Sequence, residues 1–436
     1  MTSRATALEW LHGFSDPKRG VGWNTASLGG LESNLRRTRV LLDLAGAPDR
    51  RMRVVLIAGT KGKGSTAALL ASILSAAGVR AGLATKPHLQ SYRERVRVDG
   101  IAIDDAAFTR GVSALHPLVE ELTRRLPAAG SPTTFELTLV LALTHFAASA
   151  CDVAVLEVGL GGKYDATNAT DPHVSVITAI SHDHTRELGT RLADIATEKA
   201  GIVRPGRVAI VAPQPPAARS AILAACARTA AVPREVTALS ARSALRDGLA
   251  LAGEHQRANA ATAIAAAEAL AEHGVPYTKG AVGRGLRMLR WPGRFEVIPG
   301  TPAIVLDGAH NDGSADALAR TLKAEFPRKR VRFVLGLMKD KDARAVVRPL
   351  LPLASAVEAT TPRGSRGLAA VELARLVRGV PVRVHADLAA ALSAARTAAS
   401  ASEIVCVTGS LTLVGEARDA LGLPVAERLF KTEGTP

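Results

Sequence analysis

Short, nearly continuous apolar runs alternate along the chain with longer stretches rich in alanine and leucine, from about Arg53 onward. The apolar runs predict strands at 54–58, 80–85, 153–158, 174–179 and 208–211. Between them, apolar positions recur with helical spacing, as in 66–77 and 135–149. Apolar strands separated by helices are typical of a parallel sheet with helices on both faces.

The same alternation starts again after a Pro-Gly break at Pro292-Gly293. Further strands are predicted at 302–307, 331–336, 354–360 and 404–408, with helices between them. We therefore predict an α/β protein of two domains. Residues 1–292 would form a P-loop mononucleotide-binding domain with a mainly parallel sheet, and residues 293–436 a smaller, Rossmann-like α/β domain. The polar segment 213–249 is too weakly patterned to assign.

The first predicted strand runs into a glycine-rich turn and then a helix, which together carry the strongest chemical signal in the chain. The turn reads Gly59-Thr60-Lys61-Gly62-Lys63-Gly64-Ser65. Glycines let backbone N–H groups approach phosphate oxygens at a helix N-terminus. Lys63 would supply a charge to the phosphates, and Ser65 or Thr66 a hydroxyl to Mg²⁺. The alternative is an ordinary strand–helix turn, because Gly64 interrupts the usual Lys-Ser/Thr pair.

Two later strand ends carry polar side chains. Glu157 closes the strand at 153–158, and His184 follows the strand at 174–179. Ligands of open α/β sheets bind at the carboxyl ends of the strands. Glu157 is thus a candidate Mg²⁺ ligand or a loop-anchoring carboxylate, and His184 a metal ligand or a hydrogen-bonded loop histidine.

Three downstream groups are weaker signals when each is taken alone. Lys199 lies in a helical stretch, where a single lysine is usually solvated. Asn259 stands near the start of an alanine-rich helix and is compatible with a cap. Asp307 closes another strand. Only their order along the chain gives them weight.

Composition narrows the class of protein. A length of 436 residues with 47% apolar residues fits two or three domains with real cores. No apolar stretch is long enough to span a bilayer, and residues 1–16 lack the layout of a secretory signal. Three widely spaced cysteines argue against a disulfide framework or zinc site and for a reducing cytoplasm.

The net charge of +15 is open to two main interpretations. It fits a solvated basic surface, or attraction of anionic substrates such as nucleotides and polycarboxylates. Aromatic residues make up only 3% of the chain, and basic residues form no long block. We therefore expect no nucleic-acid partner.

Taken in order, the motifs resemble those of the folylpolyglutamate synthase/dihydrofolate synthase family within the Mur ligase superfamily. The similarity runs from about Ala5 to Leu421. It rests on the glycine-rich turn and on these further motifs: Pro87-His88-Leu89, Glu94-Arg95-Val96, Thr134-Phe135-Glu136, Glu157-Val158-Gly159-Leu160-Gly161-Gly162, Asp183-His184-Thr185, Glu198-Lys199-Ala200-Gly201-Ile202, Gly253-Glu254-His255-Gln256, Pro292-Gly293-Arg294-Phe295-Glu296, Asp307-Gly308-Ala309-His310-Asn311 and Val407-Thr408-Gly409-Ser410-Leu411.

The resemblance implies an ATP- and Mg²⁺-dependent ligase, with K⁺ as a further candidate cation. A substrate carboxylate would attack the γ-phosphate of ATP, and the amino group of L-glutamate would then displace phosphate from the acyl phosphate. The substrates would be ATP, L-glutamate and a pterin acid, either dihydropteroate or a reduced folate. We expect a cytoplasmic monomer.

The resemblance also implies roles for particular residues. Lys63, His184 and a carbamylated Lys199 would be catalytic. The nucleotide would be bound by Gly59, Thr60, Lys61, Gly62, Lys63, Gly64, Ser65, Asn259, Arg294 and Asp307. The metal would be bound by Ser65, Glu157, His184 and Lys199. The pterin acid or glutamate would be bound by Leu28, Gly29, Gly30, Thr134, Phe135, Glu136, Tyr164, Asp165, Ala166, His310 and Ser410.

Several positions depart from the family pattern. Lys86 stands where many relatives carry a serine that helps to hold Mg²⁺, and a protonated lysine cannot be that ligand. Asp312 replaces a usual proline, and Lys163-Tyr164 a common Arg-Leu pair. The region 213–253 is shorter than in many relatives.

Two other functions remain compatible with the sequence. The first is another acid–amino acid ligase of the superfamily that acts on a different carboxylate. The second is a P-loop switch or motor that only binds and hydrolyses nucleotide. The sequence leaves open whether the chain makes dihydrofolate, extends polyglutamate tails, or does both.

Overall fold

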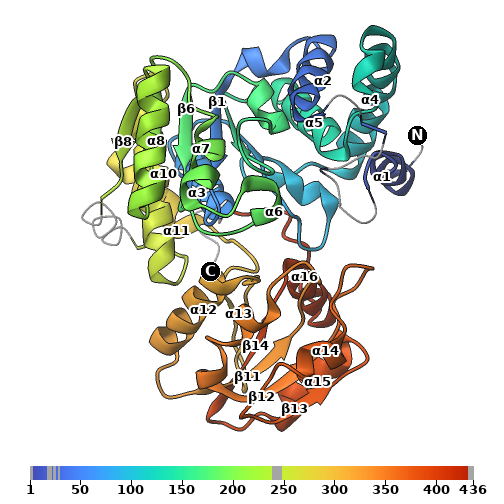
Figure 1. Cartoon of the computed structure of the whole chain (residues 1–436), viewed down its shortest axis with the longest axis vertical. Coiled ribbons are helices and arrows are strands. Elements are labelled where there is room, and N and C mark those ends of the chain that lie inside the picture. Colours follow the sequence, from blue (N-terminus) through green and yellow to red (C-terminus); the bar gives the residue numbers. More distant parts are fainter. Residues whose placement is uncertain (1–2, 17–21, 23–25, 28–29, 238–247, 431–436) are drawn as a thin grey trace.

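The computed structural model describes residues 3–16, 22, 26–27, 30–237 and 248–430. It contains two separate sheets, one in each half of the chain, and each sheet is covered by helices (Figure 1). The first sheet with its helices is called the N-terminal domain, and the second the C-terminal domain. The predicted fold class, a P-loop α/β domain followed by a smaller Rossmann-like domain, is confirmed.

The N-terminal sheet has the strand order β4-β3-β2-β5-β1-β6-β7-β8 in the described part of the chain. All neighbours from β2 to β8 are parallel, and the hairpin β2-β3-β4 is antiparallel. The strands are β1 (Arg53–Ala58), β2 (Ala81–Ala84), β3 (Val96–Val98), β4 (Ile101–Ala102), β5 (Val153–Glu157), β6 (Val174–Ile177), β7 (Val208–Val211) and β8 (Val232–Glu235).

Alternate residues of the central strand β1 face opposite helical layers. Val55 and Ile57 belong to the core under α3 (Lys63–Ala76), α10 (Glu254–Ala271) and α11 (Lys279–Met288). Val54 and Leu56 belong to the core on the other face. That face is covered by α1 (Arg4–His12), α2 (Gly30–Leu44), α4 (Asp105–Arg125) and α5 (Thr134–Ala148), and farther along the sheet by α7 (Leu192–Ala200) and α8 (Pro216–Thr229).

The C-terminal sheet has the order β13-β12-β11-β14-β10-β9, with only β9 antiparallel to its neighbour. Its strands are β9 (Glu296–Ile298), β10 (Ile304–Leu306), β11 (Arg330–Leu335), β12 (Ala354–Ala359), β13 (Val382–Val384) and β14 (Glu403–Thr408). Its helices are α12 (Asp312–Glu325), α13 (Ala343–Val347), α14 (Ala370–Ala374), α15 (Leu388–Ala398) and α16 (Leu411–Ala420).

All the strands predicted from apolar runs are present, with ends shifted by at most two residues. The strands that the pattern missed are β3, β4, β8, β9 and β13. β4, β8, β9 and β13 lie at the sheet edges, and β3 lies next to β4. All five are short or exposed, so their sequences carry little apolar signal. The unassigned segment 213–249 contains α8 and β8, and residues 238–247 of it lie outside the described part.

Two expectations from composition can be compared with the structure. Cys151, Cys226 and Cys406 are free and buried, as expected of small core residues. None of the helices in the described ranges has both the length and the apolar character needed to cross a lipid bilayer.

Candidate active site

The glycine-rich turn joins β1 to the N-terminus of α3, as predicted, with Gly62 at the N-cap position. The backbone N–H groups of Thr60 and Lys61 both donate to the carbonyl of Ala179, at 3.0 Å each. The hydroxyl of Thr60 donates to the carbonyl of Ser181. The turn is therefore fixed against the loop after β6, at the carboxyl edge of the sheet.

Two glycines of the turn have no room for a side chain. Gly59 has φ +144°, and a Cβ there would lie 1.9 Å from Oγ1 of Thr178. Gly62 has φ +83°, and its Cβ would lie 2.2 Å from Oδ1 of Asn259. Glycine is required at both positions by backbone conformation and by close packing. The packing of Asn259 against Gly62 makes α10 a wall of the phosphate loop.

Asn259 is not the cap of α10. The helix begins at Glu254, with Gly253 at the N-cap position. Asn259 lies in the second turn, is buried, and donates from Nδ2 to Oε1 of Gln256 at 2.8 Å. The possibility that it is only a helix cap is therefore wrong, and its side chain lies against the phosphate loop.

Lys63 and Ser65 occupy the first turn of α3. The ammonium of Lys63 donates to the carbonyl of Gly59 at 2.9 Å. Ser65 is buried, and so is the neighbouring Thr66, whose hydroxyl has no hydrogen-bond partner within the described residues. The turn therefore presents a lysine and hydroxyl groups at a helix N-terminus, as anion binding requires.

Glu157 lies at the end of β5, beside the turn. A Cβ on Gly64 would be 3.3 Å from Oε2 of Glu157. The same oxygen accepts a hydrogen bond from the backbone N–H of Lys86 at 3.0 Å. Glu157 thus joins the phosphate loop to the segment after β2, while Oε1 has no hydrogen-bond partner among the described residues.

Lys86 and Lys199 bring positive charge to the same place. Burial, and then Lys63, lowers the pKa of Lys86 to about 8. Burial, and then Lys63 and Lys86, lowers the pKa of Lys199 to about 7. Lys199 lies in α7 and is 4% exposed. It is therefore not the solvated lysine that its helical context predicts, and a large part of its amine is neutral near pH 7.

Asp183 connects the two domains next to His184. Its carboxylate lies 3.9 Å from Nζ of Lys61 in the phosphate loop and 3.6 Å from Nζ of Lys341 in the C-terminal domain. It also accepts a hydrogen bond from Asn311 at 3.2 Å. Although burial acts in the opposite direction, Lys341 and Lys61 lower the pKa of Asp183 to about 2. His184 follows with φ +50° and an exposed imidazole.

Arg294 and Asp307 come from the start of the C-terminal domain. Asp307 accepts hydrogen bonds from the backbone N–H groups of Phe295 at 2.8 Å and Ala309 at 2.9 Å. Burial lowers the pKa of Arg294, and the charges of Asp307 and Glu157 oppose this shift. Arg294 thus interacts electrostatically with Glu157, at the end of β5 in the N-terminal domain.

His310 and Ser410 follow β10 and β14 in the C-terminal domain. Nδ1 of His310 lies 2.7 Å from the carbonyl of Gly308, and burial lowers the pKa of this histidine to about 4. Ser410 is the N-cap of α16, where its hydroxyl accepts from the N–H of Leu413. Both residues lie at carboxyl ends of parallel strands.

The residues predicted to contact a pterin fall into two groups. Phe135 lines a cavity together with Lys86, Arg95, Thr138 and Glu157. Thr134 and Glu136 are instead buried with partners of their own, since Thr134 donates to the carbonyl of Leu11 and Glu136 pairs with Arg37 at 2.8 Å. Thr134 and Glu136 therefore hold α5 in place and put Phe135 at the cavity.

The loop after β5 carries three more of the residues predicted to contact a pterin, namely Tyr164, Asp165 and Ala166. Oδ1 of Asp165 accepts from the N–H and hydroxyl of Thr167, and Oδ2 accepts from the N–H of Leu160. Ala166 is buried, and Tyr164 lies under the ammonium of Lys163, 4.7 Å from the ring centre.

The remaining predicted pterin contacts lie near the N-terminus. Gly30 begins α2, whereas Leu28 and Gly29 lie outside the described residues.

Sequence reasoning missed two residues that the fold brings to this edge. Lys341 comes from the loop after β11 and reaches Asp183. Trp291 lies in the hinge, the segment 289–294 where the chain passes into the C-terminal domain, and its ring is 3.5 Å from where a Cβ on Gly64 would be. Neither lies in a phosphate-binding or strand-end pattern, although the Pro-Gly break after Trp291 marks the hinge itself.

Hard oxygen donors are available for a divalent cation. Within the described ranges, no group of three or more histidine, cysteine, aspartate or glutamate side chains is close enough together to hold a metal. Ser65 and Glu157 offer a hydroxyl and a carboxylate oxygen beside the phosphate loop. This set fits Mg²⁺, which binds through few protein ligands and takes the others from substrate phosphates and water.

The chain matches two protein families. Residues 57–229 match the Mur ligase middle domain, and residues 293–411 match the Mur ligase glutamate ligase domain. A dihydrofolate synthase/folylpolyglutamate synthase from Bacillus subtilis is 33% identical over 90% of this chain and 96% of its own length.

A probable bifunctional folylpolyglutamate synthase/dihydropteroate synthase from Halobacterium salinarum is 39% identical over 84% of this chain. The chain spans about half of that longer relative, 46% of its length.

Solved structures agree with these matches. Escherichia coli FolC in complex with DHPP and ADP is 30% identical, with a TM-score of 0.80 and coverage of 97% of this chain and 98% of that one. A bifunctional folylpolyglutamate synthase/dihydrofolate synthase with Mn, AMPPNP and L-glutamate bound is 28% identical, also with a TM-score of 0.80, and covers 97% and 99%.

The phosphate loop gives a direct prediction. Gly59→Ala places a methyl group against Thr178 and forces the loop to shift, so ADP affinity measured by calorimetry should fall by about 10- to 100-fold. Gly78→Ala is the matched control, because Gly78 also has positive φ but faces open space. Wild-type ADP affinity in a folded Gly59→Ala protein would contradict the assignment of this loop.

Proposed function

The chain belongs to the dihydrofolate synthase/folylpolyglutamate synthase family of Mur ligases, and on this basis we propose that it joins L-glutamate to a pterin acid at the expense of ATP. Members of this family are ATP-dependent ligases that form C–N bonds, and this chain is an enzyme of that class. The acceptor is dihydropteroate, a glutamylated tetrahydrofolate, or both.

The reaction has two steps. A carboxylate oxygen of the pterin acid attacks the γ-phosphorus of ATP, the bond to the β–γ bridging oxygen breaks, and ADP leaves. The amino nitrogen of glutamate then attacks the acyl phosphate carbon. The tetrahedral intermediate expels phosphate, the nitrogen loses a proton, and an amide remains. Such transfers depend on alignment and charge neutralisation more than on a protein nucleophile.

The charge balance at the carboxyl edge of the N-terminal sheet carries this proposal. The basic side chains of Lys63, Lys86 and Lys199 interact there with one another and with Glu157 and Asp165. Both oxygens of Asp165 already accept hydrogen bonds, and one oxygen of Glu157 does. This gathering of buried lysine side chains supports a site at which two anions, a triphosphate and a carboxylate, meet.

The nucleotide would lie on the phosphate loop, between Asn259 on one side and Arg294 and Asp307 of the C-terminal domain on the other. Ser65, Glu157, His184 and carbamylated Lys199 would hold divalent cations, with Mg²⁺ as the proposed metal. When bound, the metal neutralises phosphate charge. The Mn and AMPPNP complex of the related synthase supports a divalent cation, and K⁺ remains a further candidate.

Lys199 has the environment that carbamylation needs. CO₂ adds to a neutral lysine amine, which loses a proton and becomes a carbamate anion. Burial and neighbouring lysines favour the neutral amine. The carbamate would then relieve the repulsion among the lysines and offer oxygen atoms to a metal.

The acid substrate would enter the cavity lined by Phe135, Lys86 and Glu157. An aromatic wall suits a flat pterin ring, and the charged end of the cavity lies beside the phosphate loop. The DHPP complex of E. coli FolC supports a pterin substrate. Glutamate would lie on the C-terminal domain, near His310 and Ser410.

Three broader features belong to the same proposal. The domain boundary lies near residue 292, next to the first residue of the glutamate ligase domain match. The free buried cysteines support a cytoplasmic location. We also propose that the protein acts as a monomer.

The function is tested by asking whether phosphate release requires both L-glutamate and a pterin acid. Protein with ATP and Mg²⁺ should release phosphate only when L-glutamate and either dihydropteroate or tetrahydrofolate are present, and the product should gain the mass of one glutamyl unit. If glutamate works only with a non-folate acid, the chain is another acid–amino acid ligase. Phosphate release without any acceptor would instead indicate a nucleotide switch or motor.

Lys199→Ala tests the carbamate. The variant should lose most ligase activity, by roughly 100-fold or more, because an anion is missing from a cationic site. Short carboxylic acids such as acetate should restore part of the activity by occupying the vacated space. Lys323→Ala, on the solvent side of α12, serves as the matched control. Near-normal activity of Lys199→Ala would exclude the carbamate role.

A further inference from the structure

The end of the described chain returns from the C-terminal domain to the N-terminal domain. Residues 424–430, here called the tail, follow α16 and run along the hairpin of β3 and β4 (Figure 1). The N–H of Ala102 donates to the carbonyl of Glu427 at 2.8 Å, and the N–H of Leu429 donates to the carbonyl of Gly100 at 3.0 Å. The tail thus adds backbone pairing at a sheet edge.

The tail is also anchored by side chains. Leu429 is 1% exposed and Phe430 is 7% exposed, and both belong to the core beneath α3, α10 and α11. The ring of Phe430 packs so closely on Gly100 that a Cβ there would lie 2.8 Å away. Glu427 pairs with Arg93, with a hydrogen bond of 3.1 Å. A segment held in this way is a fixed part of the N-terminal domain.

The tail contacts the hinge as well. The N–H of Arg290 donates to the carbonyl of Leu429 at 2.6 Å, and Leu289 pairs with Phe430 in an antiparallel bridge. The hinge, residues 289–294, is where the chain passes into the C-terminal domain. The two crossings between the domains therefore lie side by side and are bonded to each other.

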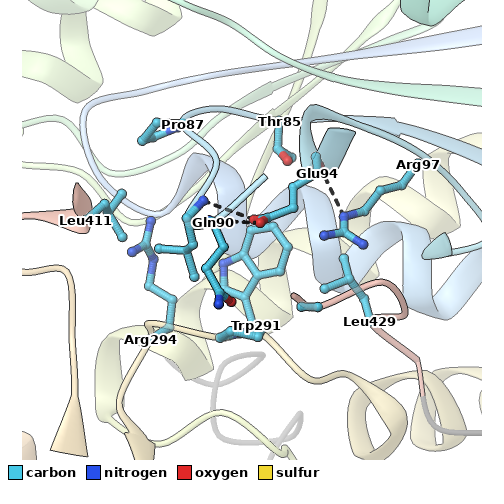
Figure 2. Close-up of a pocket in the computed structure, with 12 residues that line it drawn as sticks. Thr85, Pro87, Gln90, Glu94, Arg97, Trp291, Arg294, Leu411 and Leu429 are labelled. Atoms are coloured by element: carbon cyan, nitrogen blue, oxygen red, sulfur yellow. Dashed lines mark hydrogen bonds between the residues drawn. The ribbon is translucent and has the colours of Figure 1, made fainter. Parts of the chain in front are cut away.

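The hinge in turn contacts the phosphate loop. The ring of Trp291 lies 3.5 Å from where a Cβ on Gly64 would be. Figure 2 shows Trp291 between Arg294 and Leu429 in one cavity, which Thr85 and Leu411 also line. Contacts thus run without a break from Leu429 through the hinge to the loop that holds the nucleotide.

We propose that Leu429 and Phe430 are positioning residues for ATP. By fixing the hinge, they hold Trp291 against the phosphate loop and Arg294 at the nucleotide. The proposal rests on the proposed function only for the identity of the ligand. The alternative is that the tail merely stabilises the N-terminal core, in which case its loss would lower the melting temperature and leave nucleotide affinity unchanged.

The test uses the full chain with Leu429→Ala and Phe430→Ala combined. Below its melting temperature, this variant should bind AMPPNP about 10- to 100-fold more weakly and show a raised KM for ATP. In a background with Trp10→Phe and Trp23→Phe, the emission of Trp291 should shift to longer wavelength even without nucleotide, because the indole becomes more exposed. Leu429→Met with Phe430→Leu should restore both readouts.

Arg428→Ala is the matched control, because this neighbouring tail side chain is exposed. It should behave as wild type in both measurements. If the double variant does not fold, the single variant Leu429→Ala tests the proposal through AMPPNP affinity and Trp291 emission. Unchanged AMPPNP affinity in a folded variant overturns the proposal, whether or not the emission of Trp291 shifts. Failure of the wild-type protein to bind AMPPNP would instead overturn the proposed function, while the emission of Trp291 still tests the tail.

Discussion

Buried positive charge at the carboxyl edge of the N-terminal sheet is the constraint on which the site depends. Lys63, Lys86 and Lys199 come from three separate segments, yet Lys63 lowers the pKa of Lys86, and Lys63 and Lys86 together lower the pKa of Lys199. Glu157 and Asp165 oppose the repulsion at Lys86, and Asp183 and Asp165 oppose it at Lys199, yet burial and the neighbouring lysines still lower both pKa values. Such an arrangement costs free energy in the empty protein and becomes favourable when anions bind. The site is thus prepared for phosphate and carboxylate before either arrives.

The second constraint is that one domain alone cannot form this site. The phosphate loop, Glu157 and Lys199 belong to the N-terminal domain, whereas Arg294, Asp307 and Lys341 belong to the C-terminal domain. Asp183 joins the two through Lys61, Lys341 and Asn311. Arg418 of the C-terminal domain also donates a hydrogen bond to Gln90 of the N-terminal domain at 2.8 Å. Substrate binding at the proposed site would therefore be coupled to the orientation of the domains, as in enzymes that complete their site by closing.

Much of this could be predicted from the sequence, for identifiable physical reasons. Apolar strands buried on both faces, such as β1 and β5, leave a strong pattern, and polar residues at their carboxyl ends mark the site. Edge strands such as β8 and β13 are exposed and left no such signal. The partners of buried polar residues were also hidden, since the pairing of Glu136 with Arg37 spans 99 positions in the sequence. Lys341 and Trp291 became visible only when the fold brought distant loops to the phosphate turn.

The most direct test of this mechanism follows oxygen atoms through one turnover. The carboxylate of the pterin acid is labelled with ¹⁸O and incubated with the protein, ATP, Mg²⁺ and L-glutamate, and the released phosphate is analysed by mass spectrometry. Attack of the carboxylate on the γ-phosphorus predicts that one labelled oxygen appears in each phosphate. Phosphate that carries no label would show that water, and not the carboxylate, receives the phosphoryl group, and would contradict ligation through an acyl phosphate.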